Sequence, residues 1–418
     1  MMSHKSTAAG RRPVEAAFHR MRSILSIAAA ACAVSTTVYA QGFKVADTNV
    51  QVHGFVQQGY IFSNGNNFLT MDTTGGSGEM TDGGINASSQ INKKLRVGMQ
   101  LYARNIGQLG NGHPQLDWAF ADYRFNQLIG VRGGKVKSAL GLYNDTQDME
   151  FLHTWALLPQ SVYALDLRSV NIAHVGADVY GALSGKRAGS LNYTVYAGLI
   201  QDDPRGGYRY GIEDSGFKFK DGMHRHGYGL DLRWTAPVDG LQMGYSQVSM
   251  PGTADVTRTG VPFPLVLGLT SFRTNAVYGD YQKRAWHVSG EWRRVLVVAK
   301  LTPAIIPVTN VPTVAWYASA AYRIAKPLEV GAYYSHFVQN TNLDATLANN
   351  HINGPAVTAR IDLNRFVAVK VEGQFMDGFG SSYASRGFYL RNNVTGIDNV
   401  NGMKNSTNML VLRTSFSF

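Results

Sequence analysis

The sequence has 418 residues, a formal net charge of +11 and one cysteine, Cys32. Because no cysteine follows residue 40, neither a disulfide framework nor a thiolate metal site is available in the rest of the chain. No run of 18 apolar residues occurs after residue 40 either, which excludes helical membrane spans. Lysine and arginine do not gather into runs, so the charge pattern gives no indication of nucleic-acid binding.

The first forty residues have the layout of a secretory signal peptide. A positive start at Arg22 precedes an apolar run, and small residues end the segment at Ala40. The apolar run is too short for a membrane-spanning helix, which needs roughly 20 residues. We therefore predict a signal peptide over 1–40 that is removed after Ala40, with Met21 as an alternative start to Met1.

The remaining chain, 41–418, carries a net charge of +7, because the first forty residues hold five Lys or Arg and one Glu (+11 − 4 = +7). Segments of about ten residues recur along it, each alternating apolar and polar side chains, and this period of two is typical of β-strands. The segments are 49–63, 80–92, 95–106, 116–126, 129–136, 171–184, 189–200, 226–236, 240–250, 272–282, 286–298, 313–324, 327–338, 354–364, 366–378 and 408–418.

The gaps between these segments alternate between short and long. The short gaps are 93–94, 127–128, 185–188, 237–239, 283–285, 325–326 and 365, and the long ones include 64–79, 137–170, 201–225, 251–271 and 379–407. Short turns at one rim, long loops at the other and an even number of strands are typical of outer-membrane barrels. We therefore predict an all-β fold: a transmembrane antiparallel β-barrel of about 16 strands, with short periplasmic turns and long extracellular loops.

The two faces of the strands indicate two environments. In 95–104, apolar residues hold every odd position from Leu95 to Ala103, whereas Arg96 and Arg104 lie on the other face. So many charged groups would be very costly in a packed core, so the polar face must meet water and the apolar face suits lipid. An antiparallel sheet with one solvated face would explain any single strand, but not sixteen of them.

The last segment, 408–418, ends on Phe418, which shares the apolar face with Leu410 and Leu412. Aromatic side chains collect where such a face meets the two bilayer interfaces. The candidates for these girdles are Tyr60, Trp118, Trp234, Trp292, Trp316 and Tyr334, each with burial in an aromatic core as its alternative.

Two stretches resemble a known family. The terminal strand LVLRTSFSF resembles the assembly signal of Gram-negative outer-membrane proteins, and 116–149 resembles the porin superfamily, near the phosphate-selective and related porins. In that family the pattern G-x-x-x-x-x-x-G-L-Y-N ends one strand and enters a long loop. The matching residues here are Gly134, Gly141, Leu142, Tyr143 and Asn144.

The resemblance implies a sixteen-stranded barrel, usually a homotrimer, whose third long loop folds into the lumen and narrows the pore. The third long loop here is 137–170, and it is rich in apolar residues such as Trp155 and Leu157. Such a composition is unlike that of a disordered segment. We therefore expect 41–418 to form the barrel and 137–170 to fold inward as its constriction loop.

Strand alternation assigns a set of basic residues to the pore wall: Arg96, Arg104, Arg132, Arg233, Arg293, Arg323, Arg360, Lys370 and Arg413. The loop adds three carboxylates at the expected constriction: Asp145, Asp148 and Glu150. An acidic loop facing a basic wall would set up a transverse field, and the basic excess would weakly favour anions. The alternative is that the wall charges pair across adjacent strands and only solvate the lumen. No dense basic ladder, which a tight anion site would need, is visible in the sequence.

These features favour a porin that lets small hydrophilic solutes diffuse passively across the bacterial outer membrane, with mild anion preference. The expected partners are outer-membrane lipids, two further copies in a homotrimer, and the barrel assembly machinery that reads the strand ending at Phe418. The alternative is an adhesin or structural barrel that acts through its long loops. An enzyme is not expected, because no outward Ser lies beside an outward His. No cofactor or metal is expected either, since His224 and His226 lack nearby carboxylates.

Overall fold

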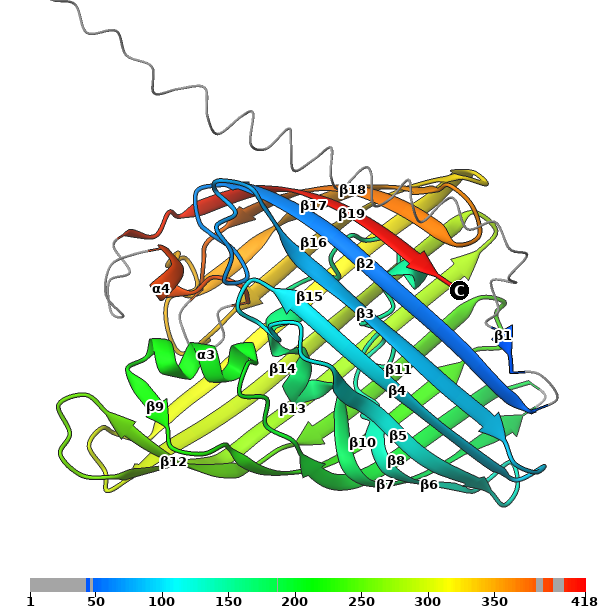
Figure 1. Ribbon diagram of the computed structural model, residues 1–418, viewed down its shortest axis with the longest axis horizontal. Coiled ribbons are helices and arrows are strands. Elements are labelled where there is room, and N and C mark those ends of the chain that lie inside the picture. The colour runs from blue at the N-terminus through cyan, green and yellow to red at the C-terminus, as the bar shows by residue number, and fades with distance from the viewer. Residues whose placement is uncertain (1–42, 46–47, 186, 381–385, 394–401) are drawn as a thin grey trace, which may run out of the picture. The chain divides into compact units, whose positions relative to one another are not determined.

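The computed structural model describes residues 43–45, 48–185, 187–380, 386–393 and 402–418. The predicted signal peptide, 1–40, lies outside these residues. All described strands belong to one sheet, whose consecutive neighbours are antiparallel. The last strand, β19 (Ser406–Ser417), pairs with β2 (Val50–Asn64), and this pairing closes the sheet into a barrel of tilted strands (Figure 1).

Nineteen strands are labelled, but three of them do not cross the wall separately, so the wall has sixteen strands. The short β1 (Phe43–Lys44) and β9 (Phe217–Phe219) are additions, and β12 (Gly252–Arg258) continues β11 (Leu241–Ser249) along the same neighbour. The other wall strands are β3 (Ser77–Gln90), β4 (Leu95–Ile106), β5 (Gln115–Arg124), β6 (Gly130–Lys137), β7 (Ala173–Gly185), β8 (Gly189–Ile200), β10 (His224–Thr235), β13 (Leu265–Lys283), β14 (Trp286–Thr302), β15 (Thr309–Ala325), β16 (Leu328–Val338), β17 (His351–Asp362) and β18 (Val367–Asp377). The predicted all-β, antiparallel, sixteen-stranded barrel is confirmed.

Connections at the two rims differ in length. Short turns such as 91–94, 284–285 and 326–327 join strands at one rim. At the other rim, 138–172 holds η1 (Glu150–Leu152), η2 (Leu165–Leu167) and α2 (Arg168–Asn171), while α3 (Gly207–Asp214) precedes β9, and α4 (Leu390–Asn393) precedes β19. No helix in the described part of the chain is both long enough and apolar enough to cross a membrane.

The predicted long loop at 251–271 is wrong over most of its length. Residues 252–258 form β12, and β13 begins at Leu265, so the hairpin continues beyond the neighbouring strands. Its apolar side chains, including Val256 and Leu267, are buried together with Phe217 and Phe219 of β9. This small apolar cluster, separate from the main one, stabilises strands in 252–258 and 265–271, where the turn-rich sequence indicated an open loop.

The two faces of the wall follow the alternation. In β19, Leu410 and Leu412 are exposed on the outer face, whereas Val411 and Arg413 are buried inside. Among the girdle candidates, Trp234, Trp292 and Tyr334 are exposed outside.

Trp118 is the exception among the girdle candidates. It lies directly opposite Gln100, whose side chain points inward to donate to Asp148, so Trp118 is on the inner face. Its ring stacks on Phe120 at a centroid distance of 5.4 Å, and the Arg132 guanidinium lies over Phe120. An inner aromatic–cation stack therefore replaces the predicted interfacial tryptophan.

Candidate functional site

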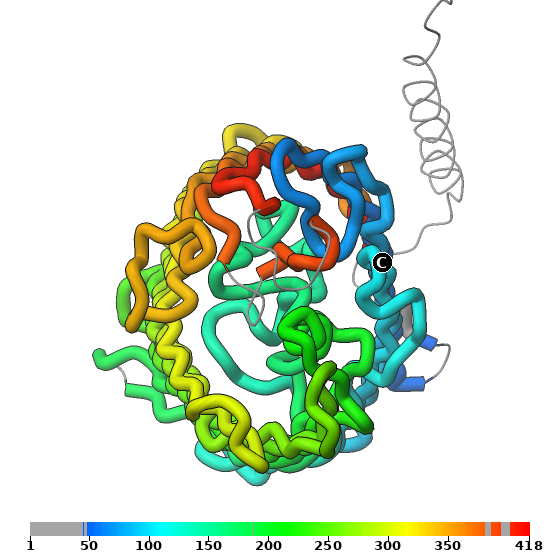
Figure 2. Tube along the Cα trace, turned by 90° about the vertical axis from the view of Figure 1, so that its left-hand side faces the viewer, coloured from blue at the N-terminus to red at the C-terminus, as the bar shows by residue number. Residues whose placement is uncertain are grey.

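The segment 138–172 leaves the end of β6 and crosses the interior of the barrel. Figure 2 looks along the barrel and shows this blue-green segment inside the ring of strands. Its apolar side chains pack on the inner wall: Trp155 meets Tyr333 edge-on at a centroid distance of 5.1 Å, and Tyr163 lies 6.3 Å from Tyr317. Polar contacts attach the segment to the wall at several places, among them those around Lys370, Asp148 and Glu291.

The two glycines of the Gly134–Asn144 motif have clear structural reasons. Gly134 has φ +129°, and a Cβ there would lie 2.2 Å from the carbonyl oxygen of Ala119. Gly141 has φ +68°, and a Cβ there would lie 2.2 Å from Oε1 of Glu291. Both positions need a residue without a side chain, because φ is positive and a Cβ would collide with an atom of a neighbouring strand.

We expect Gly141→Ala to lower the free energy of unfolding by about 1–3 kcal/mol, the usual cost of an L side chain held in a left-handed conformation. The new Cβ would also displace Glu291 from the backbone of the segment. Urea denaturation of refolded protein measures the effect. Gly279→Ala is the matched control, because its Cβ would have only one neighbour, at 3.9 Å. Equal midpoints for the two variants would contradict the expectation.

The first attachment is a ladder of cations on three adjacent strands. Arg360 of β17 lies directly opposite Lys370 of β18, which lies directly opposite Arg413 of β19. Like charges in directly opposed positions destabilise a sheet unless other groups compensate them. The segment supplies this compensation: Arg360 donates to the carbonyl of His153, and Arg413 donates to the carbonyl of Ala156 at 3.0 Å.

Lys370 holds the centre of this ladder, and its side chain is fully buried. Its Nζ donates to the carbonyl oxygens of Glu150, His153 and Trp155, and forms an ion pair of 2.6 Å with Oε1 of Glu150. Arg413 is compensated in a similar way by Asp82, 2.7 Å from its Nη2. The ladder therefore fixes the position of residues 150–156 inside the barrel.

The second attachment centres on Asp148, which the wall encloses almost completely. One of its carboxylate oxygens lies 2.7 Å from Nζ of Lys137, and the other accepts from Gln100 at 2.7 Å and lies 3.6 Å from Arg168. Arg168 also donates to both oxygens of Asp117, at 2.8 and 2.9 Å. This buried network joins the segment to the wall on the side of β4 and β5.

The third attachment centres on Glu291 of β14. Its carboxylate accepts from the backbone N–H of Leu142 at 3.0 Å, from the hydroxyl of Tyr163 and from Nε of Arg293 at 2.6 Å. Arg293 in turn donates to the carbonyl of Val162 at 3.1 Å. Leu142 near the start of the segment and Tyr163 in its second half are thus bound to one carboxylate.

The charges within the segment are set by these contacts. Burial would raise the pKa of Asp148, but Lys137 and Arg168 outweigh burial and bring this pKa below its ordinary value. Lys370 and Arg413 likewise outweigh burial at Glu150 and lower its pKa. Burial lowers the pKa of His153 to about 4, so at neutral pH the carboxylates are ionised and His153 is neutral.

The structure places the residues selected from the sequence in different surroundings. Among the three segment carboxylates, Asp148 and Glu150 are buried in ion pairs, whereas Asp145 is exposed. Eight of the nine basic wall residues form ion pairs with carboxylates: Arg104 with Asp203, Arg132 with Asp122 and Asp178, Arg233 with Asp231, Arg293 with Glu291, Arg323 with Glu329 and Asp362, Arg360 with Asp362, Lys370 with Glu150, and Arg413 with Asp82. Arg96 is exposed, and its guanidinium reaches Ser88 at 3.4 Å. This pairing corresponds to the alternative in which wall charges neutralise one another.

Several residues of the site were not found from the sequence. Asp82 lies on a strand without any motif, and Asp117 and Lys137 lie in 116–149 but are not among the residues that carry the resemblance. Arg168 lies where the segment returns to the wall. The basic ladder was missed as well, because the three cations come from separate strands and only their register brings them together. No short-range pattern could have indicated these pairings.

Of three comparisons with known proteins, the one with solved structures gives matches. No family model matches the sequence, and the search of curated proteins found no match. Solved structures do match along most of the chain at low identity. OmpF of Salmonella typhi, in complex with daunomycin, is 13% identical over 91% of this chain and 99% of that chain, with a TM-score of 0.54.

Two further structures give the same result. The anion-selective porin from Comamonas acidovorans is 12% identical over 89% of this chain and 100% of that chain, with a TM-score of 0.52. OmpT of Vibrio cholerae is 10% identical over 90% and 99%, with a TM-score of 0.51. Likeness at these identities concerns the fold, and nearness to the phosphate-selective branch stays a prediction from 116–149. The chain therefore has the general fold of Gram-negative outer-membrane porins.

Proposed function

We propose that this protein is an outer-membrane porin through which small hydrophilic solutes diffuse passively, with a mild preference for anions. One observation carries the proposal: a closed sixteen-stranded wall is charged inside and apolar outside, and an interior segment lies against a ladder of cations. Barrels of this size have a lumen wider than wall side chains alone can fill. An excess of fixed positive charge near a narrow passage lowers the barrier for anions.

We propose that 138–172 forms the constriction of this channel. Asp148 and Glu150 serve there as anchors, because each is neutralised by a buried cation. Each cation of the ladder has a carboxylate partner: Asp362 for Arg360, Glu150 for Lys370 and Asp82 for Arg413. The support for the anion preference is therefore the net charge of +7 over 41–418 and the exposed Arg96 on the inner face.

The remaining parts of the proposal follow the same fold. A signal peptide over 1–40 would export the chain, and the assembly machinery would recognise the strand ending at Phe418. The mature barrel would lie in the outer membrane as a homotrimer and would have no catalytic activity. The apolar outer face of β19 supports contact with lipid.

Single-channel recording of refolded protein in planar bilayers tests this function. We expect stepwise openings in multiples of three, and a reversal potential under a salt gradient that favours chloride over potassium. Arg96→Glu should shift the reversal potential toward cations, because Arg96 is exposed on the inner face and forms no ion pair within the described residues. Lys283→Glu, at the exposed short-turn rim, is the matched control and should change it little. Absence of conductance from correctly folded protein would contradict the proposal.

The packing of the interior favours a second candidate, a structural barrel or adhesin that acts through its long loops. Trp155, Leu157 and Tyr163 are buried with wall side chains in one apolar cluster, so part of the lumen is filled. A barrel closed by this segment would still present the connections 201–223 and 339–350 to a partner. Folded protein that binds a cell surface without conducting would support this candidate.

A further inference from the structure

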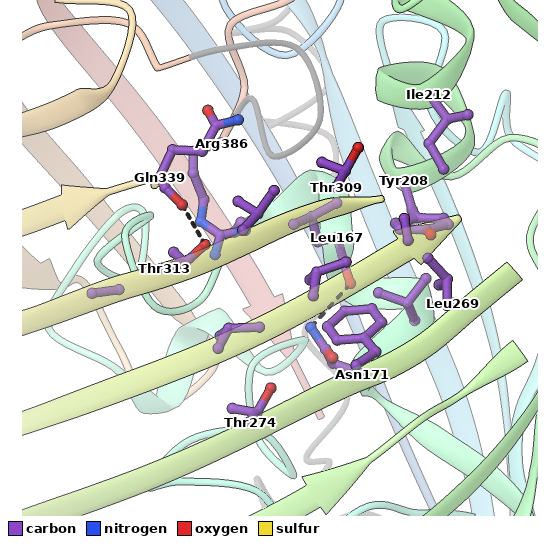
Figure 3. Close-up of a pocket in the computed structure, with 18 of the residues that line it drawn as sticks. Leu167, Asn171, Tyr208, Ile212, Leu269, Thr274, Thr309, Thr313, Gln339 and Arg386 are labelled. Atoms are coloured by element: carbon purple, nitrogen blue, oxygen red, sulfur yellow. Dashed lines mark hydrogen bonds between the residues drawn. The ribbon is translucent and has the colours of Figure 1, made fainter. Parts of the chain in front are cut away.

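A cavity of about 140 Å³ lies between the interior segment and the inner face of β13, β14 and β15 (Figure 3). Leu167 and Asn171 bound it on the segment side, and Tyr208 and Ile212 of α3 bound it toward the long-loop rim. Its wall is apolar over three adjacent strands. The side chains that form this wall include Leu269, Phe272, Val295, Val297, Ala299 and Val311.

This apolar lining differs from the rest of the inner wall. Nearer the short turn 284–285, the inner face of β14 carries Ser289 and Glu291, as expected for a surface that meets water, and Arg293 follows at the edge of the cavity. After Arg293 in the chain, the inward-facing residues of β14 are Val295, Val297 and Ala299. Apolar surface left in contact with water costs about 25 cal/mol per Å². Phe272, Val297 and Ala299 pack partly against the buried cluster beside β9, and the part of their surface that lines the cavity is open to an apolar ligand.

Part of the cavity lining is polar and cationic. Arg293, which is only 5% exposed, lines it and uses Nε and Nη1 for Glu291 and Val162. Its Nη2 is buried and has no hydrogen-bond acceptor among the described residues. Arg386 lines the same space and donates through Nε to the carbonyl of Ser161 at 3.2 Å.

No carboxylate belongs to the cavity lining within the described residues, whereas Arg293, Lys300 and Arg386 do, and Arg293 is paired with Glu291 beside the cavity. Burial lowers the pKa of Arg386 to about 10, and a buried cation of this kind is stabilised by a nearby anion. A ligand with a carboxylate at one end would supply the acceptor that Arg293 lacks. Its other end would meet the apolar strands.

We propose that this cavity is a binding site for a small carboxylate with an apolar body, such as an aromatic acid or a short fatty acid. A cavity of about 150 Å³ lined by apolar side chains is large enough to hold benzene, so one benzene ring matches the space here. The carboxylate accepts from Nη2 of Arg293 and is attracted by Arg386. The proposal deepens the porin function by naming a solute class, and it rests on that function only for the ligand's route through the lumen.

Isothermal titration of refolded protein in detergent micelles with benzoate tests this site. Acetate, which lacks the ring, and benzyl alcohol, which lacks the charge, are the comparison ligands. We expect benzoate to bind at least tenfold more tightly than either. Equal affinities for the three ligands, or no binding of benzoate, would overturn the proposal.

Substitutions that fill the cavity with a larger side chain test whether benzoate binds there. Ala299→Phe places a ring in the cavity and should weaken benzoate binding at least tenfold, whereas Ala318→Phe, on the exposed outer face of β15, should leave it unchanged. Val297→Phe repeats the test if Ala299→Phe does not refold. Arg386→Gln should reduce the advantage of benzoate over benzyl alcohol. If Ala299→Phe and Val297→Phe both bound benzoate with wild-type affinity, benzoate would bind outside the cavity, and the proposal would be overturned.

Conductance of the same preparations in potassium chloride separates this proposal from the porin function. Benzoate binding without conductance would retain the site and reject the open channel. Conductance without benzoate binding would retain the channel and reject the site.

Discussion

Lys370→Met is expected to lower the free energy of unfolding by about 3–5 kcal/mol, because it removes one partner of a fully buried ion pair. Nζ of Lys370 lies 2.6 Å from the Glu150 carboxylate and donates to three carbonyl oxygens of the interior segment. Without it, the Glu150 carboxylate would remain buried beside an apolar side chain. We therefore expect residues 150–156 to leave the wall and become accessible to chymotrypsin at Phe151 and Trp155.

Urea denaturation in lipid vesicles and limited proteolysis measure these effects of Lys370→Met. Lys283→Met is the matched control, because the exposed Lys283 lies 4.0 Å from Asp239 in a rim ion pair worth about 0–1 kcal/mol. The double variant Lys370→Met, Glu150→Gln should lose less stability than Lys370→Met, since it leaves no unpaired carboxylate. An unchanged midpoint and an unchanged digest for Lys370→Met would show that the ladder does not hold the segment.

Leu412→Lys is expected to destabilise the folded barrel by about 2–4 kcal/mol, the cost of a lysine on the lipid face near the bilayer midplane. Leu412 lies halfway along β19, is 39% exposed on the outer face, and is flanked by Val371 and Tyr60 on the neighbouring strands. The cost arises because an ammonium group placed there must either lose its hydration or reach for the interface.

Asn408→Lys supplies the control on the same face of the same strand. Asn408 is exposed near the long-loop rim, where a lysine costs about 0–1 kcal/mol. Folding into vesicles of defined acyl-chain length, followed by urea titration, compares the two variants. If both lost the same stability, the outer face of β19 would not be in contact with hydrocarbon.

Much of the architecture could be predicted because it depends on local patterns. A period of two and the spacing of turn residues act over a few residues, and they located sixteen strands to within a few positions at most ends. Where this failed, a tertiary contact competed with the pattern. Residues 252–258 form a strand because Val256 is buried against β9, and Trp118 faces inward because the register sets it opposite Gln100.

The sequence by itself determined the all-β class, the strand count, the alternation of faces and which residues could carry charge inside the barrel. Only the tertiary structure decided which of these charges meet. Arg360, Lys370 and Arg413 become neighbours through strand register, and Glu150 and Asp148 reach their partners because 138–172 folds across the interior. The same folding encloses the apolar cavity beside β14. Alternation is a property of consecutive residues, whereas pairing depends on contacts between residues far apart in the chain, which no local pattern records.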